Sequence, residues 1–236
     1  MQRNYCAMKK IFGTLLLSFT LLGASTFGQQ PDTLVHHYEP VKFKGWVAPA
    51  AMIGYGLLRN SIHGINNLDL STYHEIKEDH PNFKTSIDNY IQYAPGGILA
   101  VISLTKMKAW HTPIQRFEVG VASAIVLGGV VYPWKKIANR LRPDGTQGES
   151  FPSGHTGTAF MTAEILHEEL KNTHPVLSYS GYLFAVGTGA LRIYNGEHWL
   201  SDVVAGAGFG FLAAKAGYWL TDRLLWKKHA RKSVVN

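Results

Sequence analysis

The chain has 236 residues, which suits one domain with a sizeable core. It is 46% hydrophobic and 17% charged, a composition too apolar for a disordered chain. Its single cysteine, Cys6, excludes an intramolecular disulfide and a cysteine-based zinc site. The net charge of +7 gathers near the two ends and forms no basic stripe, so no nucleic-acid partner is expected.

The first residues have the pattern of a secretory signal peptide. Lys9 and Lys10 precede an apolar run at residues 11–22, and three small residues follow it. The run is shorter than the roughly 20 residues that span a bilayer. We therefore expect residues 1–28 to be a signal peptide, with an uncleaved anchor helix as the alternative.

Six apolar stretches follow, separated by polar or Gly- and Pro-rich joints. None alternates with a period of two, and most exceed the length of an ordinary strand, so each is predicted to be a helix. The stretches are residues 46–58, 94–104, 119–134, 156–166, 176–191 and 203–220. The predicted fold class is all-α, a helical bundle of about six core helices.

The pattern also divides the chain into regions. Residues 29–92 are predicted to form a polar region with one short apolar helix, and within it residues 59–92 should be a loop with at most one short amphipathic helix. Residues 93–222 should form the core, and residues 223–236 a basic tail.

The bundle could be embedded in a bilayer or packed as a water-soluble core. Residues 119–134 and 203–220 approach spanning length. Lysine and arginine flank the first and the last apolar runs, as they do at the cytoplasmic ends of membrane helices. We therefore favour a membrane-embedded bundle.

The first cluster with chemical meaning is Lys135 followed by Arg142-Pro143, beside a turn at Asp144-Gly145. Arginine offers a planar fork that matches a phosphate group, and lysine offers a compact point charge. Two cations beside one joint are more often a solvated helix end, so this cluster alone predicts little.

The second cluster is Pro152-Ser153-Gly154-His155, at the start of the fourth predicted helix. Ser153 is a suitable N-cap, and the free N–H groups of a helix start favour an anion. Gly154 would let that anion approach the backbone. His155 titrates near neutral pH and could protonate a leaving group. An ordinary capped helix with a surface histidine is the alternative.

In the third cluster His198 and Asp202 are four residues apart, so on a helix they share one face. The carboxylate can hold the imidazole tautomer that leaves the other ring nitrogen free to attack or to accept a proton. Arg192, ahead of the Asn195-Gly196 turn, can reach the same anion.

The same helical stripe continues through Gly206, Gly210 and Ala214, which are all small. Small residues at this spacing permit close packing of helices. The stripe should therefore face the interior, which places His198 and Asp202 at one mouth of the bundle.

Together the clusters supply three cations, a helix start, two histidines and one orienting carboxylate. This set fits a phosphoryl-binding site with a nucleophile and a general acid. It includes no carboxylate cluster for a divalent metal, so metal-free phosphoryl transfer without a cofactor is predicted.

The clusters K-x6-RP, PSGH and R-x5-H-x3-D resemble the signature of the type 2 phosphatidic acid phosphatase (PAP2) superfamily. The resemblance covers roughly residues 90–220. Leu191 stands where the family usually has serine before the motif arginine. The residues that match the phosphate-binding positions are nevertheless all present.

The resemblance implies residue roles. His198 would attack phosphorus and form a phosphohistidine, Asp202 would orient it, and His155 would protonate the leaving group and then activate water. The phosphoryl oxygens would be held by Lys135, Arg142, Ser153, the Gly154 backbone and Arg192.

The resemblance further implies a phosphatase, and we expect its substrate to be a lipid phosphate. Lipid A, undecaprenyl diphosphate, phosphatidylglycerol phosphate and phosphatidic acid are the candidates. The alternatives are a soluble periplasmic non-specific acid phosphatase, a vanadium haloperoxidase and a non-catalytic lipid-binding membrane protein.

The expected location is the bacterial cell envelope, in the inner membrane with the site facing the periplasm. After signal cleavage, residues 94–104 and 119–134 would cross inward and back. Their joint, which carries Lys106, Lys108 and Arg116, would be cytoplasmic, and so would the basic C-terminal tail, in agreement with the positive-inside rule. If residues 46–58 also span the membrane, this orientation inverts.

Overall fold

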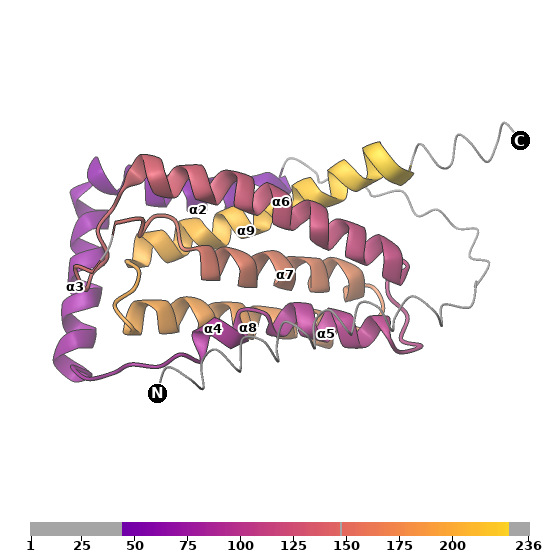
Figure 1. The fold of residues 1–236 in the computed structure, drawn as a ribbon, viewed down its shortest axis with the longest axis horizontal. Coiled ribbons are helices and arrows are strands. Elements are labelled where there is room, and N and C mark those ends of the chain that lie inside the picture. Colours follow the sequence, from indigo (N-terminus) through magenta and orange to yellow (C-terminus); the bar gives the residue numbers. More distant parts are fainter. Residues whose placement is uncertain (1–43, 147, 227–236) are drawn as a thin grey trace, which may run out of the picture. The chain divides into compact units, whose positions relative to one another are not determined.

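In the computed structural model the described residues are 44–146 and 148–226, and all their regular elements are helical (Figure 1). This confirms the all-α prediction. The predicted signal peptide at residues 1–28, with Cys6, lies outside the described residues, as do residues 227–236 of the predicted basic tail.

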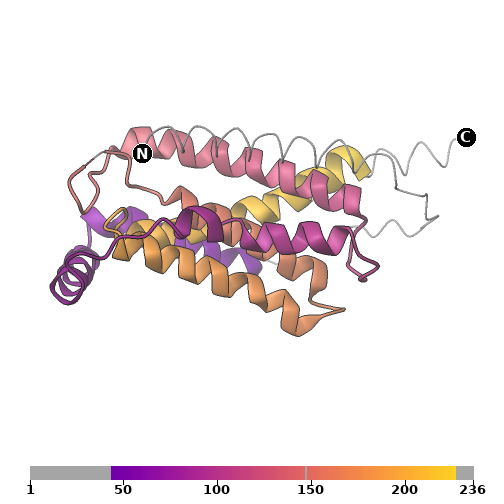
Figure 2. The ribbon, with the colours of Figure 1, turned by 60° about the horizontal axis from the view of Figure 1, so that its bottom comes forward.

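Each of the six predicted apolar stretches forms a helix. They are α2 (Lys44–Leu57), α5 (Ala94–Ser103), α6 (Pro113–Ala138), α7 (Gly154–Leu170), α8 (Pro175–Tyr194) and α9 (Leu200–Thr221). A π-helical turn, η3 (Asp222–Trp226), continues α9. Helices α7 and α9 each carry more buried side chains than any other helix, and α6, α8 and α2 pack around them (Figures 1 and 2).

The ends of the long helices follow local rules. Helix α6 begins with a capping box, in which the Thr112 hydroxyl accepts from the Gln115 backbone N–H and Gln115 accepts from the Thr112 N–H, and Pro113 occupies the first helical position. Asn139 ends the helix in the left-handed region, with φ of 36°.

The prediction of a loop with one short helix at residues 59–92 is wrong. This section contains η2 (Leu58–Asn60), the 17-residue helix α3 (His63–Asp79) and α4 (Asp88–Ile91). Helix α3 is polar on most sides, so its sequence carries little helical periodicity. Contacts with the rest of the molecule favour the helix despite this weak local signal.

Helix α3 lies across one end of the bundle, at the left of Figure 1, and Figure 2 shows it nearly end-on. Its anchor is Asp69, which is 1% exposed. Asp69 accepts hydrogen bonds from the Ser201 N–H at 2.8 Å and hydroxyl at 2.6 Å, and from the Arg140 guanidinium at 2.7 Å. A charged contact of this kind fixes a polar helix that buries little apolar surface.

The predicted small-residue stripe does face the interior. A Cβ on Gly206 would lie 2.5 Å from the Ser153 carbonyl oxygen, and one on Gly210 would lie 2.5 Å from the Gly157 carbonyl oxygen. Ala214 is fully buried. Helices α7 and α9 therefore approach as closely as their backbones allow, which confirms the packing that the spacing predicts.

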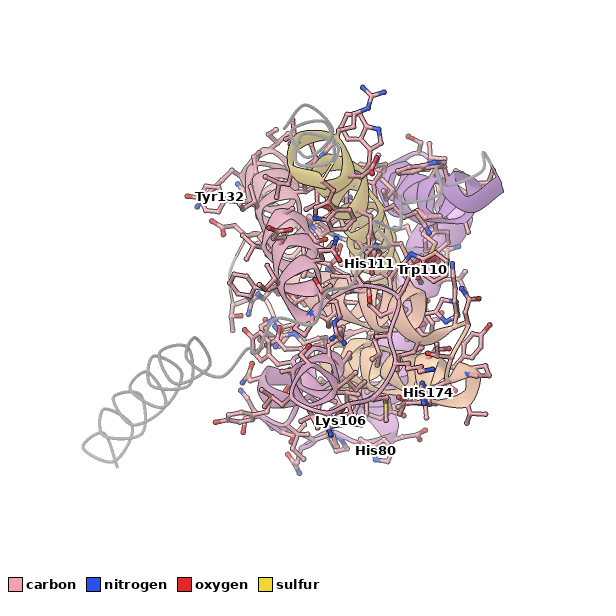
Figure 3. All side chains as sticks on the ribbon, turned by 90° about the vertical axis from the view of Figure 1, so that its right-hand side faces the viewer. His80, Lys106, Trp110, His111, Tyr132 and His174 are labelled. Atoms are coloured by element: carbon pink, nitrogen blue, oxygen red, sulfur yellow. The ribbon has the colours of Figure 1, made fainter. Side chains whose placement is uncertain are left out.

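Two helices are long and apolar enough to cross a membrane, α6 and the segment Leu200–Trp226 that contains α9. The α9 segment is mostly buried inside the bundle, whereas α6 exposes most of its apolar length. The exposed apolar side chains of α6 are Ile114, Phe117, Val121, Ile125, Tyr132 and Ile137. Tyr132, labelled in Figure 3, points away from the helices. An apolar outer surface of this extent suits contact with lipid.

The end of the bundle opposite α3 is held by a second buried polar cluster (Figure 3). The Glu169 carboxylate lies 2.7 Å from the His111 Nδ1 and accepts from the Tyr218 hydroxyl at 2.7 Å. His111 also donates its backbone N–H to Glu169 at 2.9 Å. This cluster ties the connection between α5 and α6 to α7 and α9.

We predict that Gly210→Ala destabilises the protein by about 1–3 kcal/mol, because the added methyl group must push α7 and α9 apart. Gly129→Ala on α6 is the matched control, since a Cβ there meets nothing within 4 Å. Thermal unfolding of the purified protein in detergent measures both. Equal unfolding temperatures for the two variants would contradict the close contact of α7 and α9.

Candidate active site

The three sequence clusters meet at the end of the bundle where α3 lies (Figure 1). The first follows the end of α6, the second begins α7, and the third joins α8 to α9. The Ser153 N–H donates to the Asp202 carbonyl at 3.1 Å, and a Cβ on Gly154 would lie 3.9 Å from the Lys135 Cε. The fold therefore brings together the residues that the sequence predicts to act together.

His198 and Asp202 lie side by side at the start of α9. His198 is 2% exposed, and its Nδ1 is 3.8 Å from the Asp202 Oδ2, too far for a direct hydrogen bond. The Ser150 hydroxyl lies between them, donating to Asp202 at 2.5 Å and lying 3.5 Å from Nδ1. The pair predicted from the i, i+4 spacing is thus bridged by a serine.

Burial lowers the pKa of His198 below its ordinary value, and the Asp202 carboxylate only partly offsets this. The imidazole is therefore neutral at pH 7. Because Nδ1 faces Ser150 and Asp202, Nε2 is the ring nitrogen left for a substrate.

Asp202 is fixed from several sides. It accepts from the Trp199 backbone N–H at 3.1 Å, as a carboxylate in the first turn of a helix often does. Its other oxygen accepts from the Arg140 guanidinium at 2.6 Å. Arg140 also binds Asp69 of α3, so one guanidinium joins the site carboxylate to the helix that crosses the end of the bundle.

The start of α7 is capped as predicted. The Ser153 side chain accepts from the Thr156 N–H at 3.4 Å and shares a hydrogen bond with the Thr156 hydroxyl at 2.9 Å. Lys135 donates to the Glu149 carbonyl at 2.6 Å. The helix start and the ammonium group thus lie close together, an arrangement that favours an anion.

The two motif arginines share one carboxylate. Arg142 and Arg192 both donate to Oε2 of Glu197, at 3.0 Å from Arg192. Arg192 is also held by Asp88 of α4, at 2.8 Å. The Nε atoms of both arginines are buried and have no hydrogen-bond partner among the described residues.

His155 lies at the edge of the site, half-buried. Its Nε2 is 2.8 Å from the Asn89 Oδ1, so in the absence of substrate that nitrogen carries the proton. Burial, with a smaller contribution from Arg192, lowers the pKa of His155 to about 4. A bound phosphate dianion would act in the opposite direction and favour the protonated imidazole.

Sequence reasoning missed several residues of the site. Arg140 lies between Lys135 and Arg142 of the first cluster, and Glu197 directly precedes His198 of the third, both at positions that the motifs leave unspecified. Their charge was the available sequence signal. Ser150 precedes the second cluster. Asp69, Asp88 and Asn89 carried no signal, because they lie far from the motifs in sequence and reach them only through α3 and α4.

Across the described residues there is no group of three or more His, Cys, Asp or Glu side chains arranged to hold a metal ion. The acidic side chains at the site are instead paired with guanidinium groups. Asp69 and Asp202 pair with Arg140, and Asp88 and Glu197 pair with Arg192.

We predict that Asp69→Asn lowers the free energy of unfolding by about 3 kcal/mol, since Arg140 then loses one of its two buried partners. The exposed Glu75→Gln on the same helix is the matched control and should change stability by at most about 0.5 kcal/mol. Denaturant unfolding in detergent measures both, and equal midpoints would show that Asp69 does not anchor α3.

Part of the chain is similar in sequence to known proteins. Residues 117–226, which include all three clusters, match the PAP2 superfamily. The lipid A 1-phosphatase of Porphyromonas gingivalis is 40% identical over 147 residues, covering 60% of this chain and 32% of that protein. This chain therefore matches about a third of the length of that relative.

Two solved structures are also similar. The crystal structure of Aquifex aeolicus LpxE has a TM-score of 0.46 at 19% identity, covering 60% of this chain and 90% of that one. A PAP2 type phosphatidylglycerolphosphate phosphatase from Bacillus subtilis has a TM-score of 0.48 at 20% identity, covering 78% and 96%. The match to the PAP2 superfamily at residues 117–226 spans all three clusters.

Proposed function

We propose that the protein is a metal-independent phosphatase that hydrolyses phosphate monoesters or diphosphates through a phosphohistidine at His198. The observation that carries this proposal is the buried imidazole of His198, held by Ser150 and Asp202 and adjacent to Arg192, which Asp88 anchors. A neutral imidazole is a nucleophile, and neighbouring guanidinium groups stabilise the charge of the phosphoryl group.

In the first step Nε2 of His198 attacks phosphorus as the bond from phosphorus to the leaving oxygen breaks. Asp202 and Ser150 hold the proton on Nδ1 and stabilise the positive charge that the ring acquires. His155 gives its proton to the leaving oxygen. In the second step neutral His155 takes a proton from water, the hydroxide attacks phosphorus, and His198 leaves.

The phosphoryl oxygens are assigned to Lys135, Arg142, Ser153, the Gly154 N–H and Arg192. Gly154 is the first residue of α7, so its free N–H can donate to a phosphoryl oxygen. Arg192 is held in place by Asp88, so its guanidinium is positioned to bind one. The Ser153 hydroxyl shares a hydrogen bond with the Thr156 hydroxyl and would turn its proton toward a bound phosphoryl oxygen.

We propose a lipid-linked substrate. Lipid A is the first candidate, because a relative that is 40% identical over 147 residues is a lipid A 1-phosphatase. Undecaprenyl diphosphate, phosphatidylglycerol phosphate and phosphatidic acid are further candidates. The exposed apolar side chains of α6 would place the bundle in a bilayer, where a lipid phosphate can reach the site at its end.

We further propose that the protein lies in the inner membrane with the site facing the periplasm. Lys106 and Lys108 lie in the connection between α5 and α6, at the end of the bundle opposite α3 (Figure 3). Basic residues of this kind mark the cytoplasmic side.

We predict that, in the presence of a chelator, the purified protein releases phosphate from micellar lipid A faster than from a soluble aryl phosphate. His198→Gln should lower this rate at least about a thousandfold, because it removes the nucleophile. His174→Gln, at the opposite end of the bundle, is the matched control and should keep the rate (Figure 3).

Three results would change the proposal. Preference for the aryl phosphate would favour a soluble-type acid phosphatase. Full activity in His198→Gln would refute the phosphohistidine, and loss of activity on chelation would refute the metal-free reaction.

For the orientation, we predict that Thr146→Cys reacts with a membrane-impermeant maleimide in intact spheroplasts, because Thr146 is exposed at the site end. Lys106→Cys, at the opposite end, should react only after permeabilisation. The experiment is best done with Cys6 replaced by serine. The reverse labelling pattern would place the site in the cytoplasm.

A further inference from the structure

Glu197 occupies the place between the two motif arginines. Both guanidinium groups donate to the same carboxylate oxygen, Oε2 of Glu197. These are the groups that the proposed function assigns to the phosphoryl oxygens, so the inference below rests on that function. An internal carboxylate therefore engages the guanidinium groups that a substrate phosphate would use.

The Glu197 carboxylate satisfies only some of the hydrogen-bond donors of the two arginines. Nε of Arg142 and Nε of Arg192 are buried and have no hydrogen-bond partner within the described part of the chain. The recorded contacts use one oxygen of Glu197 for both arginines. A phosphoryl group brings three oxygens and up to two negative charges, so it can satisfy more of these donors than a carboxylate does.

Glu197 is also the member of the cluster that can move. Its side chain is 26% exposed, whereas that of Arg192 is 6% exposed and is held by the buried carboxylate of Asp88. Gly196, just before it, adopts a positive φ of 70° in the turn that joins α8 to α9. Arg192 is therefore fixed by Asp88, whereas Glu197 and Arg142, which is 23% exposed, both reach the surface, so the carboxylate can turn outward into water.

We propose that Glu197 is a specificity-determining residue that selects phosphomonoesters by charge. A phosphomonoester dianion carries twice the charge of the carboxylate and displaces it. A phosphodiester monoanion carries the same charge as the Glu197 carboxylate, so it gains too little binding free energy to displace it. Phosphodiester groups are the headgroup linkage of ordinary phospholipids, which a site at a bilayer surface meets in large excess.

Glu197→Gln should bind anions more tightly than the wild-type protein. The amide keeps the size of the side chain but cannot neutralise two guanidinium groups, so it competes less well with any anion. Binding of inorganic phosphate at pH 8 should strengthen about tenfold, the effect of one charge-assisted contact. Phosphatidylglycerol, a monoanionic diester, should then inhibit the variant and not the wild-type protein.

The test compares wild type, Glu197→Gln and Glu168→Gln in detergent micelles. Glu168→Gln is the matched control, because it removes the same charge from the opposite end of α7, where Glu168 pairs with Lys171. Calorimetry and the phosphate-induced rise in unfolding temperature measure binding of inorganic phosphate. Turnover of a lipid phosphomonoester, with and without phosphatidylglycerol in the micelle, measures selectivity.

The expected result is tighter phosphate binding, a larger phosphate-induced stabilisation and new inhibition by phosphatidylglycerol in Glu197→Gln alone. Unchanged or weaker phosphate binding in that variant would overturn the proposal, since it would show that Glu197 positions the arginines for substrate. Equal inhibition of all three proteins would overturn it as well. If wild type binds phosphate but hydrolyses no monoester, the proposed function fails, and the binding comparison still decides the role of Glu197.

Discussion

The site depends on the guanidinium group of Arg140, which pairs at once with Asp69 and Asp202 at 2.7 Å and 2.6 Å. Both carboxylates are fully enclosed, so without this cation they would be uncompensated charges in the interior. Arg140 joins three parts of the chain: the loop after α6, helix α3 and the first turn of α9. Because Asp202 and Ser150 in turn hold His198, the orientation of the proposed nucleophile follows from this one charge network.

A similar charge network surrounds Arg192, in the last turn of α8. Arg192 is paired with Asp88 of α4 on one side and Glu197 on the other. Segments before residues 117–226, the part that matches the PAP2 superfamily, therefore supply acidic anchors for residues within it. Asn89 similarly binds His155. Groups fixed in this way do not reorganise when charge develops on a substrate, which is the main source of electrostatic stabilisation in enzymes. Glu197 differs from Asp69 and Asp88 because its side chain is partly exposed.

Backbone contact between α7 and α9 sets the dimensions of the site. Gly206 allows the Ser153 carbonyl to lie against α9, and the Ser153 N–H binds the carbonyl of Asp202. The cap of one helix is thereby placed beside the first turn of the other. A larger residue at position 206 would separate the start of α7 from His198. The polar cluster around Glu169 closes the opposite end, so the bundle is fixed at both ends.

The sequence by itself determined the six core helices, the cap at Ser153, the inward stripe at Gly206 and Gly210, and the residues of the three motifs. These features are local, since helical periodicity, capping and i, i+4 spacing act within a few turns. Only the tertiary structure decided that residues 63–79 form a helix, that Ser150 bridges His198 and Asp202, and that Asp69, Asp88 and Glu197 pair with the arginines. These contacts join residues up to 104 positions apart. Partners of that kind are chosen by packing and charge in the folded molecule, not by spacing along the chain.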